Sequence, residues 1–90
     1  MSTEDIIKFE SREQITESLR MKRDLSGADL SGLDLSGIKL AGLNMEGANL
    51  SETNLENAVL AANNMAGVNL TAAQLNEAQI AAANMSSANL

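Results

Sequence analysis

The chain has 90 residues, of which twelve are acidic and six are basic, and its net charge is −6. It contains no Cys, His, Trp, Tyr or Pro and a single Phe, which excludes disulfide frameworks, Cys/His zinc sites and histidine acid–base catalysis. The acidic balance disfavours direct binding of nucleic acid. No apolar run approaches the roughly 20 residues of a membrane-spanning helix, and no secretory signal is evident, so we expect no membrane contact and a cytoplasmic location by default.

Residues 1–22 are rich in charge, with nine of the eighteen charged side chains of the whole chain. Ser11–Gln14 fits a capping box, in which a Ser side chain and a Gln three residues later satisfy the first backbone N–H groups of a helix. Ile15 and Leu19 then lie on one helical face. The pattern predicts a short helix from about residue 12 to residue 21.

An extended piece is expected before this helix, and it carries three apolar residues: Ile6, Ile7 and Phe9. We interpret the whole segment as a cap, because the end of a stacked repeat exposes apolar side chains and unpaired backbone that need cover. Three residues are the candidates for the plug: Phe9, Ile15 and Leu19. The alternative is an amphipathic helix that binds a membrane or a partner protein.

From residue 23 to residue 90 the chain repeats a five-residue block with an apolar residue at its centre. The fourteen centres are Leu25, Leu30, Leu35, Leu40, Met45, Leu50, Leu55, Leu60, Met65, Leu70, Leu75, Ile80, Met85 and Leu90. The residue two before the centre is apolar in eleven blocks, and the residue between them is Asp, Asn or Gln in twelve. Each block therefore alternates apolar and polar side chains, as an extended strand does.

A period of five fits neither a straight strand nor a straight helix. A strand would place successive centres on opposite faces, and a helix at about 100° per residue would scatter them around its surface. Only a chain that bends once per block keeps every centre inside, so the repeat predicts a solenoid of short strands and corners. Met45, Met65 and Met85 are spaced 20 residues apart, which indicates four blocks in each coil.

Blocks such as Ala28–Gly32 (ADLSG) and Ala48–Glu52 (ANLSE) resemble the A(D/N)LXX signature of the pentapeptide-repeat family. The resemblance covers residues 23–90 and implies an all-β solenoid, specifically a right-handed quadrilateral β-helix with four pentapeptides per coil. With the short N-terminal α-helical cap, this divides the chain into a capping segment, 1–22, and a repeat domain, 23–90. Because the family is functionally diverse, the resemblance predicts the fold but does not identify a single function.

The corners and polar columns follow from the same register. Five consecutive blocks end in Gly, which tolerates positive φ, so we expect type II turns there and a different turn where later blocks end in other residues. Asn44, Asn64 and Asn84 should stack in one column, either as a hydrogen-bond ladder or because Asn tolerates corner geometry. Thr53 and Asn63 are polar where an inward apolar residue is expected, and a buried Asn63 needs a hydrogen-bond partner.

Outward side chains sort into four faces, and two of these faces are unlike each other, which predicts a two-sided rod. The face around Leu60 is flat and nearly uncharged, which suggests a protein contact, although Ala can also be merely small. Its candidate contact residues are Val59, Ala61, Ala62, Ala81 and Ala82. The face around Leu55 is acidic. The aspartates at positions 24, 29 and 34 fall on three different faces, so they cannot converge on one metal ion.

No nucleophile lies beside a general base in this pattern, so we expect no enzyme and no cofactor. The first functional hypothesis is a non-catalytic structural or protein-interaction scaffold, either by itself or as a module of a larger protein or assembly, with a protein partner or self-association. The repeat stops at a centre, Leu90, within an incomplete coil, and we expect this end to be continued or covered by another molecule.

The second hypothesis follows from the resemblance, because some pentapeptide-repeat proteins mimic duplex DNA and bind DNA gyrase. The acidic charge agrees with it, whereas the length disagrees. Residues 23–90 would form a rod of roughly 16 Å at strand spacing, and a duplex of that length carries roughly ten charges. The repeat has seven acidic and two basic residues, a net charge of −5. A third hypothesis is a repeat fragment without a function of its own.

Overall fold

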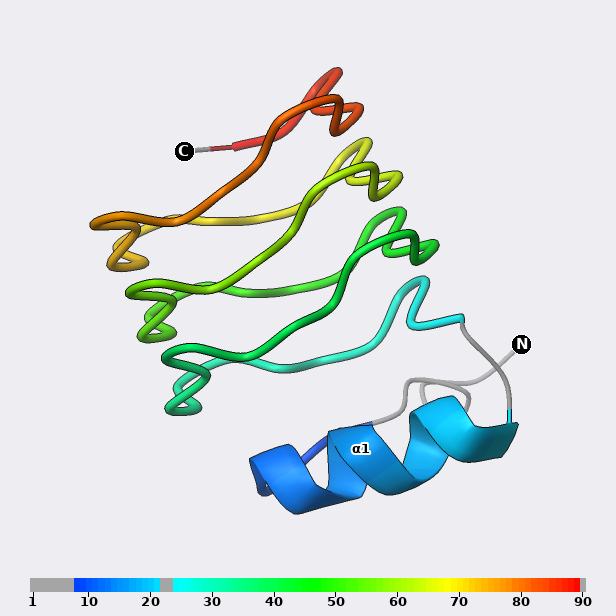
Figure 1. Cartoon of the computed structure of the whole chain (residues 1–90). Coiled ribbons are helices and arrows are strands. Elements are labelled where there is room, and N and C mark those ends of the chain that lie inside the picture. The colour runs from blue at the N-terminus through cyan, green and yellow to red at the C-terminus, as the bar shows by residue number, and fades with distance from the viewer. Residues whose placement is uncertain (1–7, 22–23, 90) are drawn as a thin grey trace.

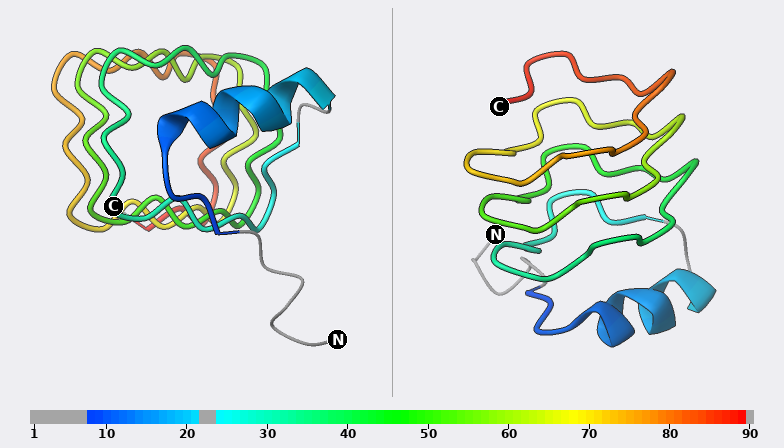
Figure 2. Two further views of the ribbon diagram at one scale, coloured as in Figure 1. Left: turned by 90° about the horizontal axis from the view of Figure 1, so that it is seen from below. Right: turned by 60° about the vertical axis from the view of Figure 1, so that its left-hand side comes forward.

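The structure is a computed structural model, and it describes residues 8–21 and 24–89. The apolar residues Ile6 and Ile7 and the last repeat centre, Leu90, lie outside the described residues. Figure 1 shows one helix, α1 (Arg12–Met21), below a stack of coils. Seen from below, the coils outline a four-sided tube, and α1 lies across its mouth (Figure 2).

The helix predicted from the capping motif is α1, with the bounds expected from the sequence. The Gln14 backbone N–H donates to Ser11 Oγ at 3.4 Å, which satisfies one first-turn donor. The Gln14 side chain turns back and accepts a hydrogen bond from the N–H of Glu10, one residue earlier than a standard capping box requires. Local polar contacts therefore define the start of α1.

The coils stack with a constant 20-residue register. Asp24 pairs in parallel with Asn44, Asn44 with Asn64, and Asn64 with Asn84, and the other three faces follow the same interval. The backbone N–H of Met45 donates to the carbonyl of Asn64 at 2.8 Å, so successive methionines lie directly above one another. The register agrees with the interval predicted from the methionine spacing.

The strands predicted within the blocks are shortened to isolated bridges, so the all-β expectation is met only in part. In the described repeat, a corner every five residues leaves one bridging residue per block. Around it, Leu30 donates its N–H to the carbonyl of Asn49 in the coil above at 2.8 Å, and Asn49 donates its own N–H back to Ala28 at 2.9 Å. These bonds satisfy backbone groups that would otherwise be buried without partners.

The repeat centres fill the interior of the stack. The ten centres from Leu25 to Leu70 are each at most 3% exposed, and small residues such as Ala48 and Ala58 pack between them. Burial declines in the last described coil, where Leu75 and Met85 are partly buried and Ile80 is 39% exposed. Among the described residues, the apolar interior is therefore most completely enclosed between Leu25 and Leu70.

The prediction of a different turn at the later corners is wrong. Residues that are not glycine also adopt positive φ there, between 59° and 63°, close to the 68–76° of the glycines. They are Glu52, Asn57, Ala62, Ala72, Glu77, Ala82 and Ser87. At these corners, as at the glycine corners, the turn bond is of the same kind: Ala58 donates its N–H to the Leu55 carbonyl at 3.0 Å. The stacking register therefore imposes one turn geometry, with the positive φ of type II turns, whatever residue is present.

Both predicted roles of Asn are present. Asn64 Nδ2 donates to Asn44 Oδ1, and Asn84 Nδ2 to Asn64 Oδ1, each at 3.4 Å, which forms the ladder. The Oδ1 atom of Asn64 also accepts the backbone N–H of Ala66, two residues further on, at 3.2 Å. The same short-range bond recurs at other bridging Asp and Asn residues, so each of these side chains starts a turn as well as marking a column.

The two inward polar residues are satisfied inside the stack. Asn63 Oδ1 accepts the N–H of Leu43 at 2.8 Å, and Asn63 Nδ2 lies 3.5 Å from the sulfur of Met45. Thr53 Oγ1 donates to the carbonyl of Leu50 at 2.8 Å. Both residues are 1% exposed. The predicted need of Asn63 for a partner is met by the backbone of the coil below.

Candidate functional site

The five predicted contact residues lie together on one side of the tube. The residues Lys39, Val59 and Gln79 bridge in one column, and the corner N–H of Ala62 donates to the carbonyl of Ala81 at 3.0 Å. We call this side the small-residue face, and it consists of Lys39, Ala41, Gly42, Val59, Ala61, Ala62, Gln79, Ala81 and Ala82. Val59 and Ala61 are half-buried, and the remaining residues of the face are exposed.

The neighbouring side carries carboxylates and amides. We call it the acidic face, and it consists of Asp34, Ser36, Asn54, Glu56, Asn57, Gln74, Asn76 and Glu77. Asn76 Nδ2 lies 3.5 Å from Glu56 Oε2. The backbone N–H and hydroxyl of Ser36 donate to Asp34 and lower the pKa of that carboxyl. Among the described residues, no three acidic side chains are arranged to hold a metal ion.

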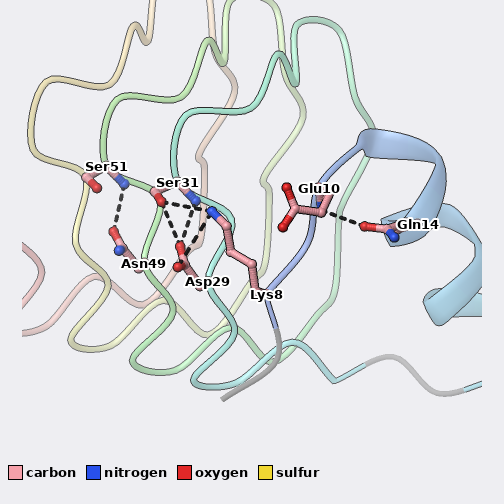
Figure 3. Close-up of polar contacts among 7 residues, drawn as sticks. All are labelled: Lys8, Glu10, Gln14, Asp29, Ser31, Asn49 and Ser51. Carbon is pink, nitrogen blue, oxygen red and sulfur yellow. Dashed lines mark hydrogen bonds and ion pairs between the residues drawn. The ribbon is translucent and has the colours of Figure 1, made fainter. Parts of the chain in front are cut away.

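The N-terminal segment, residues 8–21, is clasped to the first coil by polar contacts (Figure 3). Lys8 Nζ lies 3.6 Å from Asp29 Oδ2 and 3.4 Å from Ser31 Oγ. The backbone N–H of Phe9 donates to the Asp29 carbonyl at 2.9 Å. On the next face, Arg12 Nη1 donates to the carbonyl of Asp34 at 3.4 Å. The clasp therefore joins two faces of the first coil.

The three predicted plug residues point into the stack. Phe9 is 4% exposed and Ile15 is fully buried, and both belong to the same apolar cluster as the repeat centres. Leu19 is partly buried against that cluster. Phe9 also occupies the place of a repeat centre, because its N–H bond to Asp29 is equivalent to the bond from Leu30 to Asn49. The segment thus covers the lower end of the apolar interior.

The Lys8–Asp29–Ser31 group attaches the N-terminal segment to the first coil. Ser31 donates both its backbone N–H, at 3.0 Å, and its hydroxyl, at 2.7 Å, to Asp29 Oδ1. These two donors, with Lys8 adding a smaller effect, lower the pKa of Asp29. The lowered pKa makes the Asp29 carboxylate a weak base toward the hydroxyl that donates to it. The group therefore works as an electrostatic clasp.

A shallow groove of about 450 Å³ runs beside α1. Its lining residues are Lys8, Phe9, Glu13, Gln14, Glu17 and Ser18. The groove is formed by the N-terminal segment alone, whereas the described interior of the coils is filled by side chains. The sequence pattern predicts neither this groove nor the clasp. Lys8 and Asp29 are 21 residues apart, whereas paired residues within the repeat are 20 apart, so the repeat interval does not bring them together.

The sequence profile described as Pentapeptide repeats (8 copies) matches residues 24–57 and again residues 53–90. The match covers well over half of the chain, and the chain belongs to the pentapeptide-repeat family. Proteins of this family are generally non-catalytic. No curated protein is significantly similar in sequence to this chain. Within residues 8–21 and 24–89, no helix is long and apolar enough to cross a membrane.

Proposed function

We propose that this protein is a non-catalytic scaffold for protein contacts, built as a right-handed quadrilateral β-helix on residues 23–90 and capped by residues 1–22. The observation that carries the proposal is the constant 20-residue register, which turns a five-residue repeat into rigid columns of outward side chains. Because side chains fill the interior of the coils, the outer faces of such a repeat are the surfaces that can contact a partner. The capping role of Phe9, Ile15 and Leu19 is supported by their contact with the core cluster.

The contact surface that we propose is the small-residue face, with Val59, Ala61, Ala62, Ala81 and Ala82 at its centre. Small side chains let a partner approach the backbone closely, and little side-chain entropy is lost on contact. The face is small: at strand spacing it covers on the order of 150 Å², against about 800 Å² per partner in a stable complex. We therefore propose either a weak contact or one that extends onto a neighbouring face.

Charged substitutions test this surface. Ala61→Lys and Ala81→Lys together place two ammonium groups on the small-residue face and should weaken self-association or binding of a partner. Thr71→Lys, on a different face, is the matched control for added charge. The readouts are mass in solution and retention of a partner. If both variants behave like the unmodified chain, the small-residue face is not the contact surface.

The DNA-mimic hypothesis has a separate test. It is favoured by the acidic net charge of the repeat and disfavoured by the placement of the acids, since Glu46, Glu52 and Glu56 project from three different faces. A supercoiling assay with DNA gyrase decides between the two functions. Inhibition at micromolar protein would favour mimicry, and unchanged supercoiling would favour the scaffold.

A further inference from the structure

The corners of the first described coil differ in composition from those of the two coils above it. By the 20-residue register, coil 1 is residues 24–43, coil 2 is residues 44–63 and coil 3 is residues 64–83. All four positive-φ corners of coil 1 are glycine, whereas three of the four in coil 2 and three of the four in coil 3 carry a Cβ. Those six corners are Glu52, Asn57, Ala62, Ala72, Glu77 and Ala82. The strain of a positive φ is therefore absent from coil 1 and present in both coils above it.

Each strained corner of coil 2 is oriented by a hydrogen bond from coil 1. The N–H of Gly42 donates to the carbonyl of Ala61 at 3.0 Å. That carbonyl belongs to the central peptide of the turn, between Ala61 and Ala62, and the orientation of this peptide gives Ala62 its φ of 62°. Two other faces have the equivalent bond, from Gly32 to Ser51 at 3.0 Å and from Gly37 to Glu56 at 2.7 Å. Coil 1 thus holds the corners of coil 2 in a conformation that residues with a Cβ adopt only at a cost.

Coil 2 acts on coil 3 in the same way. The N–H of Ala62 donates to the carbonyl of Ala81 at 3.0 Å, and the next residue, Ala82, has a φ of 63°. Below coil 1 lies α1 instead of a coil (Figure 1), and glycine adopts positive φ there without support from a coil beneath. One column of corners is glycine in all three coils and does not distinguish them: Gly27, Gly47 and Gly67. In the other three columns, every corner with a Cβ has a coil beneath it.

We propose that coil 1 is the folding template of the repeat: it forms first, and each coil then sets the corners of the coil above. A stack of repeats can nucleate at any repeat, so the one with the smallest local cost forms first. Coils 2 and 3 without coil 1 would close six strained corners, and those of coil 2 would have no bond from below. Coils 1 and 2 close only three, each supported by a glycine of coil 1. This inference goes beyond the proposed contact face and does not depend on it.

One column of corners provides matched variants, because Gly42, Ala62 and Ala82 occupy the same place in three successive coils. Gly42→Ala adds strain to coil 1, whereas Ala62→Gly and Ala82→Gly remove strain from coils 2 and 3. The readout is the rates of folding and unfolding of the full chain, measured by stopped-flow far-UV circular dichroism.

We expect Gly42→Ala to slow folding about fivefold and to change the unfolding rate by less than about twofold, because a corner that is formed in the transition state acts on the folding rate. Ala62→Gly and Ala82→Gly should each slow unfolding about fivefold and change the folding rate by less than about twofold, because their corners form later.

A second experiment separates the composition of the corners from their position in the stack. Glu52→Gly/Asn57→Gly/Ala62→Gly gives coil 2 the corner composition of coil 1, so that either coil can form first. In this background, Gly42→Ala should slow folding by less than about twofold, because a second route to the stack is open. If it still slows folding about fivefold, corner composition does not set the order of assembly and the proposal is wrong.

The single variants can also overturn the proposal. If Gly42→Ala changes only the unfolding rate, the corner of coil 1 forms after the transition state. If Ala82→Gly accelerates folding, the corner of coil 3 is already formed there. Should Gly42→Ala fail to fold, Ala62→Gly and Ala82→Gly decide alone, because both relieve strain, and faster folding of either would contradict the template.

Discussion

A single backbone angle recurs at the corners of the coils. Thirteen described residues have φ between 59° and 76°, and seven of them are not glycine. For an L-residue this conformation costs roughly 1–2 kcal/mol relative to the right-handed region. Hydrogen bonds across the corners hold it in place: Glu52 donates its N–H to Thr71 in the coil above at 2.9 Å. Each such corner stores local strain that the stacked coils offset.

Replacing a strained alanine by glycine tests this account. Ala62, at φ 62°, sits in an internal coil. Ala62→Gly should raise the free energy of unfolding by about 1 kcal/mol, because glycine adopts this φ without steric penalty. The matched control is Ala61→Gly at the neighbouring corner residue, where φ is not positive and glycine should cost about 0.5–1 kcal/mol. Urea unfolding measures both, and a destabilising Ala62→Gly would contradict the account.

The buried amide of Asn63 gives a second prediction for a single residue. Asn63→Ala should lower the free energy of unfolding by about 1–3 kcal/mol, because it leaves the buried N–H of Leu43 without its acceptor. Thr53→Val should change stability by less than about 1 kcal/mol, since it removes a hydroxyl bonded only locally, to Leu50. Chemical denaturation of the two variants checks the contrast. Equal effects would show that Asn63 has no special role in joining the coils.

The turn bonds that Asp29 and Asp34 accept give the fold an acid sensitivity. The pKa of Asp29 is lowered by the N–H and hydroxyl of Ser31 and by Lys8, and that of Asp34 by the N–H and hydroxyl of Ser36. A carboxyl whose folded pKa is depressed contributes stability that is present above its unfolded pKa of about 3.9 and is lost as the pH falls through the folded value. Stability should therefore be flat near neutral pH and fall below about pH 4.

Asparagine substitution tests the origin of this sensitivity. Asp29→Asn/Asp34→Asn should reduce the loss of stability at acid pH, because Asn can accept the same turn hydrogen bond but carries no charge. Asn49 already makes the same bond to the N–H of Ser51, at 3.0 Å, one coil above Asp29. Thermal unfolding between pH 2 and pH 7 measures the effect. If the double variant loses as much stability at acid pH as the unmodified chain, the acid sensitivity comes from other carboxyls.

Elements with a local signal were predictable from the sequence, and contacts between elements were less so. Ser11 and Gln14 predicted α1 because capping depends on neighbours in the chain. The 20-residue register followed from the methionine spacing, because stacking repeats the same environment. The clasp between Lys8 and Asp29 could not be predicted, since nothing in a repeat pattern tells where a segment outside the repeat returns to it.

The corners were mispredicted for a different physical reason. Glycine was used as the marker of positive φ, and this local preference is weaker than the stacking constraint at residues such as Ala82 and Ser87. The candidate contact face was predictable as a set, because the register alone brings its members together. Its exposure was not, since half-burial of Val59 depends on how neighbouring coils pack.

The molecule as a whole behaves as a one-dimensional stack. Each described coil contacts the coils directly above and below through the same bonds, so stability and surface pattern both build up coil by coil. The small-residue face and the proposed N-terminal cap both depend on this arrangement. A different register would scatter the small residues and would remove the resemblance between Phe9 and a repeat centre.

Disulfide trapping tests the 20-residue register most directly, because the chain contains no native cysteine. Glu46 and Ala66 occupy equivalent corner positions, and the Gly47 N–H donates to the Ala66 carbonyl at 2.8 Å. Coils at strand spacing, about 4.8 Å, fall within the Cα separation that a disulfide requires. Glu46→Cys/Ala66→Cys should therefore oxidise to an intramolecular disulfide, and Glu46→Cys/Thr71→Cys, which spans 25 residues, should not. Efficient trapping of the second pair in place of the first would contradict the stacked-coil account.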